Sequence, residues 1–401
     1  MNQLRILLAS ETYPPDTNGA AIFVEHLAND LAQSGHEIMV VAPGTAFRDE
    51  IKKEKNNLSI FRIKSISLKP IHPYFRATYR INLTEKINAI TDDFNPEIIH
   101  IHNHFSVGRS CLSIAKKKSI PIIGTNHFMP DNLTEYFPRA IEKKISSYMW
   151  QDFLKVYNQL NYVTAPSQVA VNMIRGLGLT VPAEVISNGI DLGKFSSPKV
   201  NRNIYKKYNI GEDIPTFLFV GRLEKDKNID LILKALAMAL NKQTIQVIIV
   251  GKGKDENKLE RLAEKLNLPD RVIFTGRVPD DDLRQFYGLA DVYIGSGTAE
   301  LQGLAVMEAM AGGLPILAVN AVALPELVKD GVNGYLFAAD KNDLADKMLE
   351  ILADENKLKS MAAQSLRLIQ VHDKENTIKQ FMDLYQKIIF SPGLSPLYSY
   401  P

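Results

Sequence analysis

Short apolar runs alternate with longer amphipathic stretches along the first half of the chain. Residues 4–9 form a largely apolar run, and residues 21–34 repeat their apolar positions with the period of a helix. Continuous apolar strands separated by helices are typical of a parallel sheet covered by helices. We expect further strands at 37–41, 98–101, 120–124, 162–165 and 183–186.

The pattern restarts after a polar, weakly periodic stretch at 191–213, which we interpret as a linker. The chain is therefore predicted to be an α/β protein with two Rossmann-like domains, over 1–195 and 196–372. Beyond residue 355 the pattern is helical to about 390, and the Pro/Gly/Ser-rich tail 391–401 is predicted to be flexible. The second half has expected strands at 216–220, 247–250, 272–275, 292–294, 315–318 and 334–337, and expected helices at 229–240 and 256–266.

Domains of this kind bind ligands at the carboxyl ends of their strands. Two such domains facing each other would hold a ligand in the cleft between them.

Composition narrows the class of protein. The chain of 401 residues is 45% hydrophobic and 23% charged, as globular proteins are, and its net charge of +2 does not suggest a nucleic-acid partner. Residues 51–155 hold 17 Lys/Arg against 9 Asp/Glu, which fits either an anionic membrane surface or a solvated face. A single cysteine excludes an intramolecular disulfide.

With no signal-like start and no apolar run of about 20 residues, we expect a cytoplasmic protein, peripheral on the inner face of the membrane if the basic segment binds lipid.

The first candidate site lies around Glu300 and Glu308. Strong helix formers at 304–311 place Glu308 inside a helix, and Glu300 in the loop before it. The entry to the helix near Gly303 offers backbone N–H groups to a nucleotide diphosphate. The Glu308 carboxylate can accept hydrogen bonds from a ribose diol, and Glu300 from a sugar hydroxyl. A surface helix with two incidental acids would show the same spacing.

Two cations form the second candidate. Arg222 and Lys227 follow an apolar strand and precede a helix, where they suit a diphosphate leaving group. A solvated charged loop is the alternative. Asp280-Asp281-Asp282 could suggest a metal, but these residues follow Pro279 and open a helix, so we interpret them as an N-cap.

The first domain offers weaker candidates. Gly19 lies in a loop between a strand and a helix, where glycine permits close approach of a ligand. His127 ends an apolar strand, where catalytic groups of α/β domains are found. His100, His102 and His104 have the period of a strand and would face one way, as metal ligands do, but no further ligand cluster stands out.

Taken together, these residues resemble glycosyltransferase family 4, whose members have the GT-B fold of two facing Rossmann-like domains. The resemblance covers nearly the whole chain. It rests on the Gly19 loop, Thr125-Asn126-His127, Ala165-Pro166-Ser167, Ser187-Asn188-Gly189-Ile190-Asp191, Gly221-Arg222 with Lys227, and the Glu300/Glu308 pair.

The resemblance implies a retaining enzyme that uses a nucleotide sugar and requires no metal or other cofactor. Its catalytic residues would be His127 near the reacting carbon, Glu300 at the donor sugar, and Arg222 and Lys227 at the diphosphate. Asn126 would lie with His127 on the acceptor side, and the C-terminal helix, about 373–390, would cross back to the first domain. The donor-binding set would also include Glu308 at the ribose, the backbone near Val278 at the nucleobase, and Gly19, Gln302, Gly303 and Leu304.

Two departures from the family pattern are informative. Gln302-Gly303-Leu304 stands where many members have a Gly-Phe-Gly-type sequence, and Val322-Ala323 stands where many have two glycines. The first departure, with the motif Asn126-His127-Phe128-Met129-Pro130, resembles the branch that glycosylates membrane diacylglycerols. That branch places a basic surface of its first domain on anionic lipid.

We therefore expect transfer of glucose from UDP-glucose to diacylglycerol. The motifs bind parts that all donors share, so GDP-mannose with a phosphatidylinositol-type lipid, or a polysaccharide or other soluble acceptor, stays open. A sugar-nucleotide epimerase and a non-catalytic lipid-binding module are alternatives of other classes. The sequence predicts no oligomeric state.

Overall fold

The computed structural model describes residues 3–16, 18–45, 48–54, 57–67, 76–78, 82–129, 139–196 and 200–390. The chain forms two compact units, Met1–Ser187 with Thr377–Pro401 (unit 1) and Asn188–Asn376 (unit 2). These limits differ from the boundaries predicted at 195/196 and 372/373, because residues 188–195 and 373–376 group with unit 2. The predicted flexible tail, 391–401, lies outside the described residues.

Unit 1 is built on an eight-stranded sheet with the order β10-β9-β8-β7-β1-β2-β4-β3. It is parallel, as predicted, except for β3, which pairs antiparallel with β4. β3, β4 and the separate β5–β6 ribbon escaped prediction. The side chains of β3 are all exposed and leave no apolar pattern. The strands are β1 (Arg5–Ala9), β2 (Glu37–Pro43), β3 (Glu50–Lys53), β4 (Leu58–Ile63), β5 (Ser65–Ser67), β6 (Arg76–Thr78), β7 (Ile98–Ile101), β8 (Ile122–Thr125), β9 (Tyr162–Ala165) and β10 (Ala183–Val185).

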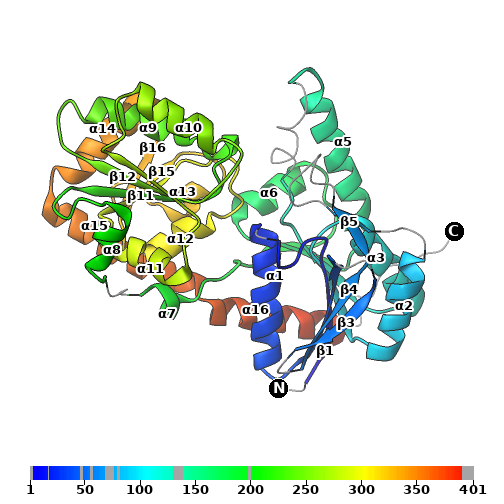
Figure 1. Ribbon diagram of the computed structural model, residues 1–401. Coiled ribbons are helices and arrows are strands. Elements are labelled where there is room, and N and C mark those ends of the chain that lie inside the picture. Colours follow the sequence, from blue (N-terminus) through cyan, green and yellow to red (C-terminus); the bar gives the residue numbers. More distant parts are fainter. Residues whose placement is uncertain are drawn as a thin grey trace. The chain divides into compact units, whose positions relative to one another are not determined.

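The C-terminal helix completes the core of unit 1. Phe381 and Tyr385 of this helix are fully buried in one cluster with side chains of β1, β2 and α1. Figure 1 shows the helix, labelled α16, next to α1. Thr377 Oγ1 also donates to the carbonyl of Ser187, at 3.1 Å. The predicted return of the last helix to the first domain is therefore confirmed. The helices of this unit are α1 (Gly19–Gln33), α2 (Leu83–Phe94), α3 (Ser106–Lys118), α5 (Arg139–Tyr157), α6 (Gln168–Gly176) and α16 (Lys374–Phe390).

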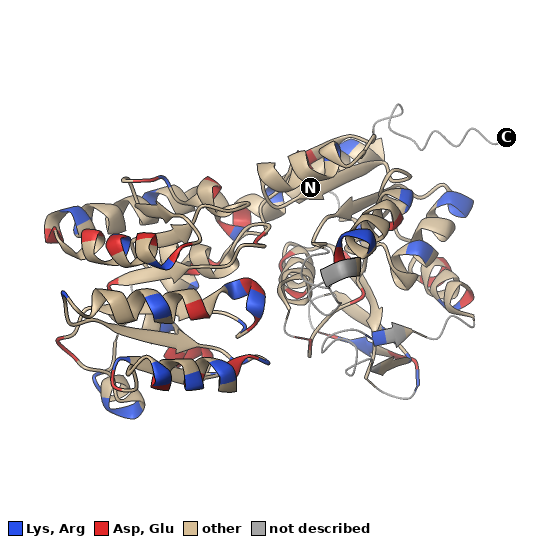
Figure 2. Cartoon of the chain, turned by 90° about the horizontal axis from the view of Figure 1, so that it is seen from above, with Lys and Arg blue, Asp and Glu red and all other residues tan. Residues whose placement is uncertain are grey.

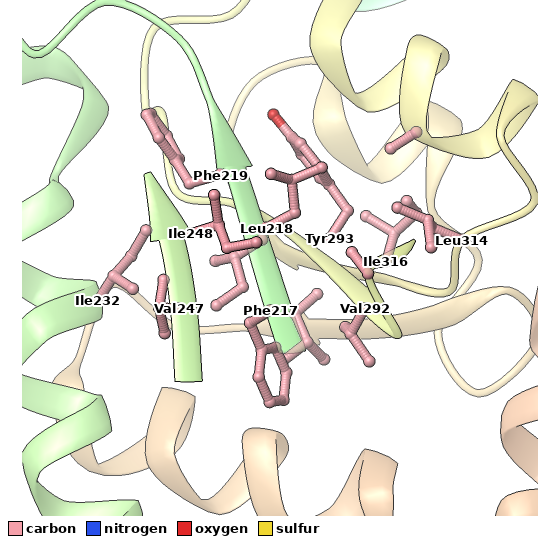
Figure 3. Close-up of a cluster of buried hydrophobic side chains, with 14 of the residues drawn as sticks. Phe217, Leu218, Phe219, Ile232, Val247, Ile248, Val292, Tyr293, Leu314 and Ile316 are labelled. Atoms are coloured by element: carbon pink, nitrogen blue, oxygen red, sulfur yellow. The ribbon is translucent and has the colours of Figure 1, made fainter. Parts of the chain in front are cut away.

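Unit 2 contains a six-stranded parallel sheet with the order β13-β12-β11-β14-β15-β16. Side chains of its three central strands, such as Phe217, Ile248 and Tyr293, pack into one continuous core (Figure 3). In Figure 1, α9, α10 and α14 lie on one face of the sheet and α11 and α12 on the other. The strands are β11 (Thr216–Val220), β12 (Gln246–Val250), β13 (Val272–Gly276), β14 (Val292–Gly295), β15 (Ile316–Val319) and β16 (Gly334–Phe337).

The described parts of the stretch interpreted as a linker, residues 191–196 and 200–213, belong to unit 2. They contain two short helices whose apolar residues Phe195 and Ile204 are buried in the core of unit 2. Short helices with one or two anchoring residues carry too little periodicity to be recognised. The helices of unit 2 are α7 (Leu192–Phe195), α8 (Asn203–Tyr208), η1 (Lys225–Lys227), α9 (Ile229–Ala239), α10 (Glu256–Lys265), α11 (Asp280–Leu289), α12 (Leu304–Ala311), α13 (Leu324–Leu327), α14 (Lys341–Leu352), α15 (Glu355–Leu368) and η2 (Ile369–His372).

Charged residues lie mostly on the helices and loops of both units, while the strands carry few (Figure 2). None of the helices within the described ranges combines the length and the apolar character that crossing a bilayer requires.

Candidate active site

The order of strands in unit 2 places the candidate donor residues. β11 pairs with β12 on one side and with β14 on the other, so the loops that leave β11 and β14 start beside each other at the carboxyl edge. The chain continues from β11 to one side of the sheet and from β14 to the other. Such a switch point opens a crevice at the ends of parallel strands.

Lys227 joins these two loops. Its Nζ lies 2.5 Å from Glu300 Oε1 of the β14 loop and 3.1 Å from Asp226 Oδ2 of its own loop. Burial lowers the pKa of Lys227, but the two carboxylates outweigh burial and raise it overall. The lysine is therefore charged at neutral pH. The sequence analysis assigned Lys227 and Glu300 to one site, and the structure brings them into contact.

Backbone hydrogen bonds hold the two loops in place. Ser296 Oγ donates to the Lys227 carbonyl at 2.5 Å, and Thr298 N donates to the Asp226 carbonyl at 3.1 Å. Asn228 adopts a left-handed conformation at φ +49° and donates from Nδ2 to the Ser296 carbonyl at 3.1 Å. These hydrogen bonds fix the backbone around Lys227, so its charged side chain can shift slightly while the backbone stays in place.

Arg222 forms an ion pair with Glu224, whose side chain is buried. The Gly221–Leu223 segment that carries Arg222 packs on the 251–253 segment. A Cβ at Gly251, where φ is +138°, would lie 1.8 Å from the Gly221 carbonyl oxygen. Glycine is therefore required for this close approach. The glycines of the 251–253 segment therefore allow it to pack closely against the Gly221–Leu223 segment.

Glu300 precedes the helix that carries Glu308, as predicted. Gly303 caps α12 with φ +89°, and a Cβ there would lie 2.7 Å from Leu324 Cδ2. Inside α12, the Glu308 carboxylate accepts a hydrogen bond from the Tyr287 hydroxyl at 2.7 Å. Burial raises the pKa of Glu308 to about 6, although the Tyr287 hydrogen bond opposes the rise. At neutral pH the carboxylate is ionised and can accept hydrogen bonds from a diol.

The other predicted donor residues lie around this centre. Gln302 is buried, and its Oε1 accepts from the backbone N–H of Asn188 at 3.0 Å, so it ties the loop to the start of unit 2. Leu304 and Val278 are partly buried against the core of unit 2, and Val278 follows β13 at the same edge of the sheet. Their contacts with a donor stay predictions.

Val322 takes up a strained conformation close to Glu300. Its φ is +45°, a left-handed value that is uncommon for a β-branched residue. The next residue, Ala323, donates its N–H to the Glu300 carbonyl at 3.3 Å. The turn after β15 therefore contains a left-handed residue, a conformation that glycine adopts without strain.

In unit 1, a cluster of histidines lies at the carboxyl ends of β7 and β8. His100 forms hydrogen bonds with the Tyr385 hydroxyl at 2.8 Å and with Thr125 Oγ1 at 2.7 Å, and the His100 and His102 ring centroids are 4.1 Å apart. His102 Nδ1 lies 3.3 Å from His127 Nε2. Tyr385 belongs to α16, so the last helix of the chain supports this cluster.

Burial keeps these imidazoles neutral. It lowers the pKa of His127 to about 3 and the pKa values of His100 and His102 far below the usual range, with mutual repulsion as a further cause for the last two. Because β8 ends at Thr125, Asn126 and His127 lie in the following loop. Asn126 Oδ1 accepts from Phe128 N at 2.8 Å, and its Nδ2 has no partner among the described residues. The rest of the 126–130 motif, Pro130, lies outside those residues.

Gly19 is the first residue of α1, which is capped by the side chain of Asn18. In the segment between β1 and α1, the Glu11 carboxylate accepts from Val107 N at the N-terminus of α3. Burial raises the pKa of Glu11 to about 7. The N-terminus of α3 is thus already occupied by a carboxylate of the protein and is not offered to a phosphate.

Two sequence interpretations need correction. His104 does not join His100 and His102, because β7 ends at Ile101; its ring packs on Phe105 and Phe128. The three aspartates after Pro279 form the first turn of α11 and do not cap it. They are paired with cations, namely Lys194–Asp280, Arg284–Asp281 and Lys207–Asp282. Within the described ranges, no group of three or more His, Cys, Asp or Glu residues is arranged to hold a metal ion.

Comparison with known proteins covers both units. Residues 17–194 match the family described as Glycosyltransferase Family 4, and residues 200–367 match Glycosyl transferases group 1. The chain belongs to glycosyltransferase family 4. It is a hexosyltransferase with the GT-B fold.

Relatives of this family member differ in what their names say they make. The chain is 29% identical over 356 residues to alpha-monoglucosyldiacylglycerol synthase of Streptococcus pneumoniae, covering 87% of this chain and 78% of the relative. It is 23% identical to a GDP-mannose-dependent alpha-mannosyltransferase of Corynebacterium glutamicum, covering 98% and 91%. A sucrose-phosphate synthase of Thermosynechococcus elongatus has a similar structure, with a TM-score of 0.80 at 21% identity over 96% of this chain and 98% of that one.

Several residues of the candidate site were not singled out from the sequence. Asp226 contacts Lys227, Tyr287 contacts Glu308, and Tyr385 contacts the histidine cluster. Asp226 adjoins Lys227 in sequence, so a signal existed for it. Tyr287 and Tyr385 lie in amphipathic helices far from their partners, and no local signal marks them.

Proposed function

We propose that this enzyme transfers a hexose, with glucose from UDP-glucose as the preferred donor, to a membrane lipid such as diacylglycerol, with retention of configuration. The observation that carries glycosyl transfer is the contact of Lys227 with Glu300 across the loops of β11 and β14. This contact supports the proposal, because a cation that can bind a diphosphate lies directly beside a carboxylate that can accept a hydrogen bond from a sugar hydroxyl.

The donor would be held by charge. Arg222 and Lys227 bind the diphosphate, and Glu308 accepts hydrogen bonds from the ribose hydroxyls. Gly303 at the start of α12 adds backbone N–H groups, which favour anions at a helix N-terminus. As the bond between the anomeric carbon and the diphosphate breaks, negative charge grows on the diphosphate, and the two cations stabilise it.

The acceptor hydroxyl would lose its proton to the departing diphosphate. Its oxygen forms the new bond to the anomeric carbon on the face that the leaving group vacates, so configuration is retained. His127 is neutral at physiological pH. It would therefore orient hydroxyl groups by hydrogen bonding, with Asn126 beside it, and carry no charge in the reaction.

Two observations support a lipid acceptor. The relative from Streptococcus pneumoniae is named for a glucosyldiacylglycerol product. Helix α5, which begins Arg139-Ala-Ile-Glu-Lys-Lys in the basic segment, exposes Ile141 and Tyr148, the latter at 65%. Exposed apolar side chains next to lysines suit the surface of an anionic bilayer. We place the enzyme on the inner face of the cell membrane through this surface.

A panel of donors and acceptors tests the proposal. The full-length enzyme is incubated with UDP-glucose, UDP-galactose or GDP-mannose and with vesicles that contain diacylglycerol and a varied fraction of anionic lipid. We expect an α-glucolipid whose yield rises with anionic content. Incorporation of sugar into no lipid from any donor would refute the lipid acceptor. Formation of an epimer without acceptor would indicate an epimerase.

The second candidate is mannosyl transfer from GDP-mannose, because the relative from Corynebacterium glutamicum covers nearly the whole chain. The same panel separates the two, since a phosphatidylinositol vesicle with GDP-mannose would then give the labelled product. Preference for GDP-mannose would overturn UDP-glucose as the donor and leave the assigned roles of Lys227 and Glu300 in place.

A further inference from the structure

In the loops that follow β11 and β14, which we call the donor loops, the ion-paired side chains include more carboxylates than cations. Arg222 and Lys227 are accompanied by Glu224, Asp226 and Glu300, so two cations face three carboxylates. A site whose assigned ligand is a diphosphate would gain affinity from the opposite balance. This excess of carboxylates weakens the binding of anions and needs a reason.

The buried side chain of Asp226 shows that the excess of carboxylates is part of the folded structure. Its side chain is 10% exposed, and neither carboxylate oxygen has a hydrogen-bond partner among the described residues. The ammonium of Lys227, 3.1 Å away, is the charge that compensates it. A buried carboxylate costs free energy if the one cation that compensates it is removed. Asp226 therefore holds Lys227 in place before any donor binds.

Glu300 is the more adaptable of the two partners. Its side chain is 28% exposed, against 10% for Asp226, and it contacts Lys227 at 2.5 Å from the other loop. A diphosphate that takes up a hydrogen bond from Lys227 therefore competes with Glu300 and comes close to its charge. An intact nucleotide sugar offers hydroxyls that can donate to the displaced carboxylate, whereas a nucleoside diphosphate offers none at that place.

We propose that Glu300, with Asp226, determines the preference of this site for the intact donor over the nucleoside diphosphate product, by competing with the diphosphate for Lys227. The inference rests on the proposed function, in which Lys227 binds the donor diphosphate. Once the sugar has left, Glu300 loses its hydroxyl partners and returns to Lys227, which expels the product. Product release limits the turnover of many enzymes. Glu300 would therefore contribute to catalysis in two steps, by binding the donor sugar and by accelerating the release of the nucleoside diphosphate.

The test compares UDP with UDP-glucose on Glu300→Gln in the full-length enzyme, with GDP and GDP-mannose measured in parallel. The amide keeps the size of the side chain and removes the charge that competes. We expect UDP to bind about tenfold more tightly, a shift in Kd by one decade, while kcat falls because the sugar loses its carboxylate. Affinity for UDP-glucose is expected to change much less than affinity for UDP.

Matched variants isolate the cause. Glu260→Gln removes one negative charge from the exposed surface of α10, away from Lys227 in sequence and contact, and should leave the Kd of UDP unchanged. Asp226→Asn should also tighten UDP, since it releases Lys227 from the second carboxylate. Thermal unfolding of each variant checks that the fold is intact.

The possible outcomes separate this inference from the proposed function. If Lys227→Ala does not weaken UDP, the donor site itself is wrongly assigned. If Lys227→Ala weakens UDP but Glu300→Gln leaves UDP affinity equal or lower, the competing role of Glu300 is refuted and the site stands. A purely structural role of Glu300 would weaken the binding of UDP and UDP-glucose together, which contradicts the expected gain in UDP affinity.

Discussion

The donor loops of unit 2 and the histidine cluster of unit 1 use polar side chains in opposite ways. Around Lys227, charged groups are paired with charged groups and part of their surface stays accessible. Around His100, ionisable groups are fully buried and kept neutral. Both arrangements lie at the carboxyl ends of parallel strands, so the fold alone does not decide which chemistry a strand end supports.

The difference follows from what surrounds each group. A neutral His100 satisfies its neighbours if the Tyr385 hydroxyl donates to Nδ1 and Nε2–H donates to Thr125 Oγ1, which leaves Thr125 to donate to Thr164 Oγ1 at 2.6 Å. No charged group is needed anywhere in this series of hydrogen bonds. The donor loops, in contrast, would each hold an uncompensated charge if any pair were broken. We conclude that unit 2 is suited to bind charge and unit 1 to orient neutral groups.

The largest effect is expected from Lys227→Ala. Loss of the cation removes stabilisation of the leaving diphosphate and leaves Asp226 buried without compensation, so kcat/KM should fall on the order of 10²–10³-fold. Lys225→Ala, an exposed neighbour on the same loop, is the control and should change kcat/KM little. Equal losses in both variants, measured by steady-state kinetics, would show that only the general charge of the loop matters.

The next effect is a dependence of donor binding on pH. The pKa of Glu308 is about 6. Because only the ionised carboxylate accepts hydrogen bonds from both ribose hydroxyls, donor affinity should fall as the pH drops through 6. Tyr287→Phe removes a hydrogen bond that lowers this pKa, so the fall should begin at a higher pH. Calorimetric Kd values for UDP between pH 5 and 8 measure the shift.

Tyr293→Phe is the matched control for this pH experiment. It also removes a buried hydroxyl of unit 2, one that donates to the Val220 carbonyl at 3.2 Å and not to Glu308. The pH at which affinity falls should stay close to that of the unchanged enzyme. A common midpoint for all three proteins would show that Glu308 does not control donor binding.

Much of this layout could be predicted from local pattern. Apolar runs located the central strands, and the helix formers before Gly312-Gly313 placed Glu308 in α12 with its observed bounds. β3 was missed because it is exposed on all sides, and α7 and α8 because each is anchored by few residues. Burial, which sets these outcomes, depends on tertiary contacts that no local window contains.

The site was predictable to the extent that its residues adjoin a motif. The pattern shows that Arg222, Lys227 and Glu300 follow strands and that Glu308 lies inside a helix. Tyr385 reaches His100 across 285 positions in the chain, and Tyr287 reaches Glu308 from a separate helix. Such partners follow only from the packing of α16 and α11.

Tyr385→Phe tests the neutral side of the comparison. Without the hydroxyl, His100 Nδ1 loses its buried partner, so the free energy of unfolding of unit 1 should fall by about 1–3 kcal/mol. Affinity for UDP should stay unchanged, because α16 contributes to the histidine cluster and not to the donor loops. Hydrogen exchange of the β7 amides gives the local stability, and Tyr148→Phe, on the exposed face of α5, is the control. A loss of UDP affinity would contradict the separation of roles.

The smallest effect is expected at Val322, where the donor side stores backbone strain. A left-handed conformation costs a residue with a side chain about 1–2 kcal/mol, while glycine costs about 0.4–1 kcal/mol in the entropy of the unfolded chain. Val322→Gly should therefore stabilise unit 2 by up to about 1 kcal/mol. Ala323→Gly is the control. Because Ala323 has φ −91°, this substitution should destabilise unit 2 instead. If Val322→Gly also raises KM for the donor, the stiff valine turn, whose next N–H donates to the Glu300 carbonyl, helps to hold the loop that presents Glu300. If KM is unchanged, the strain is unrelated to the charged site, and the contrast between the units rests on side chains alone.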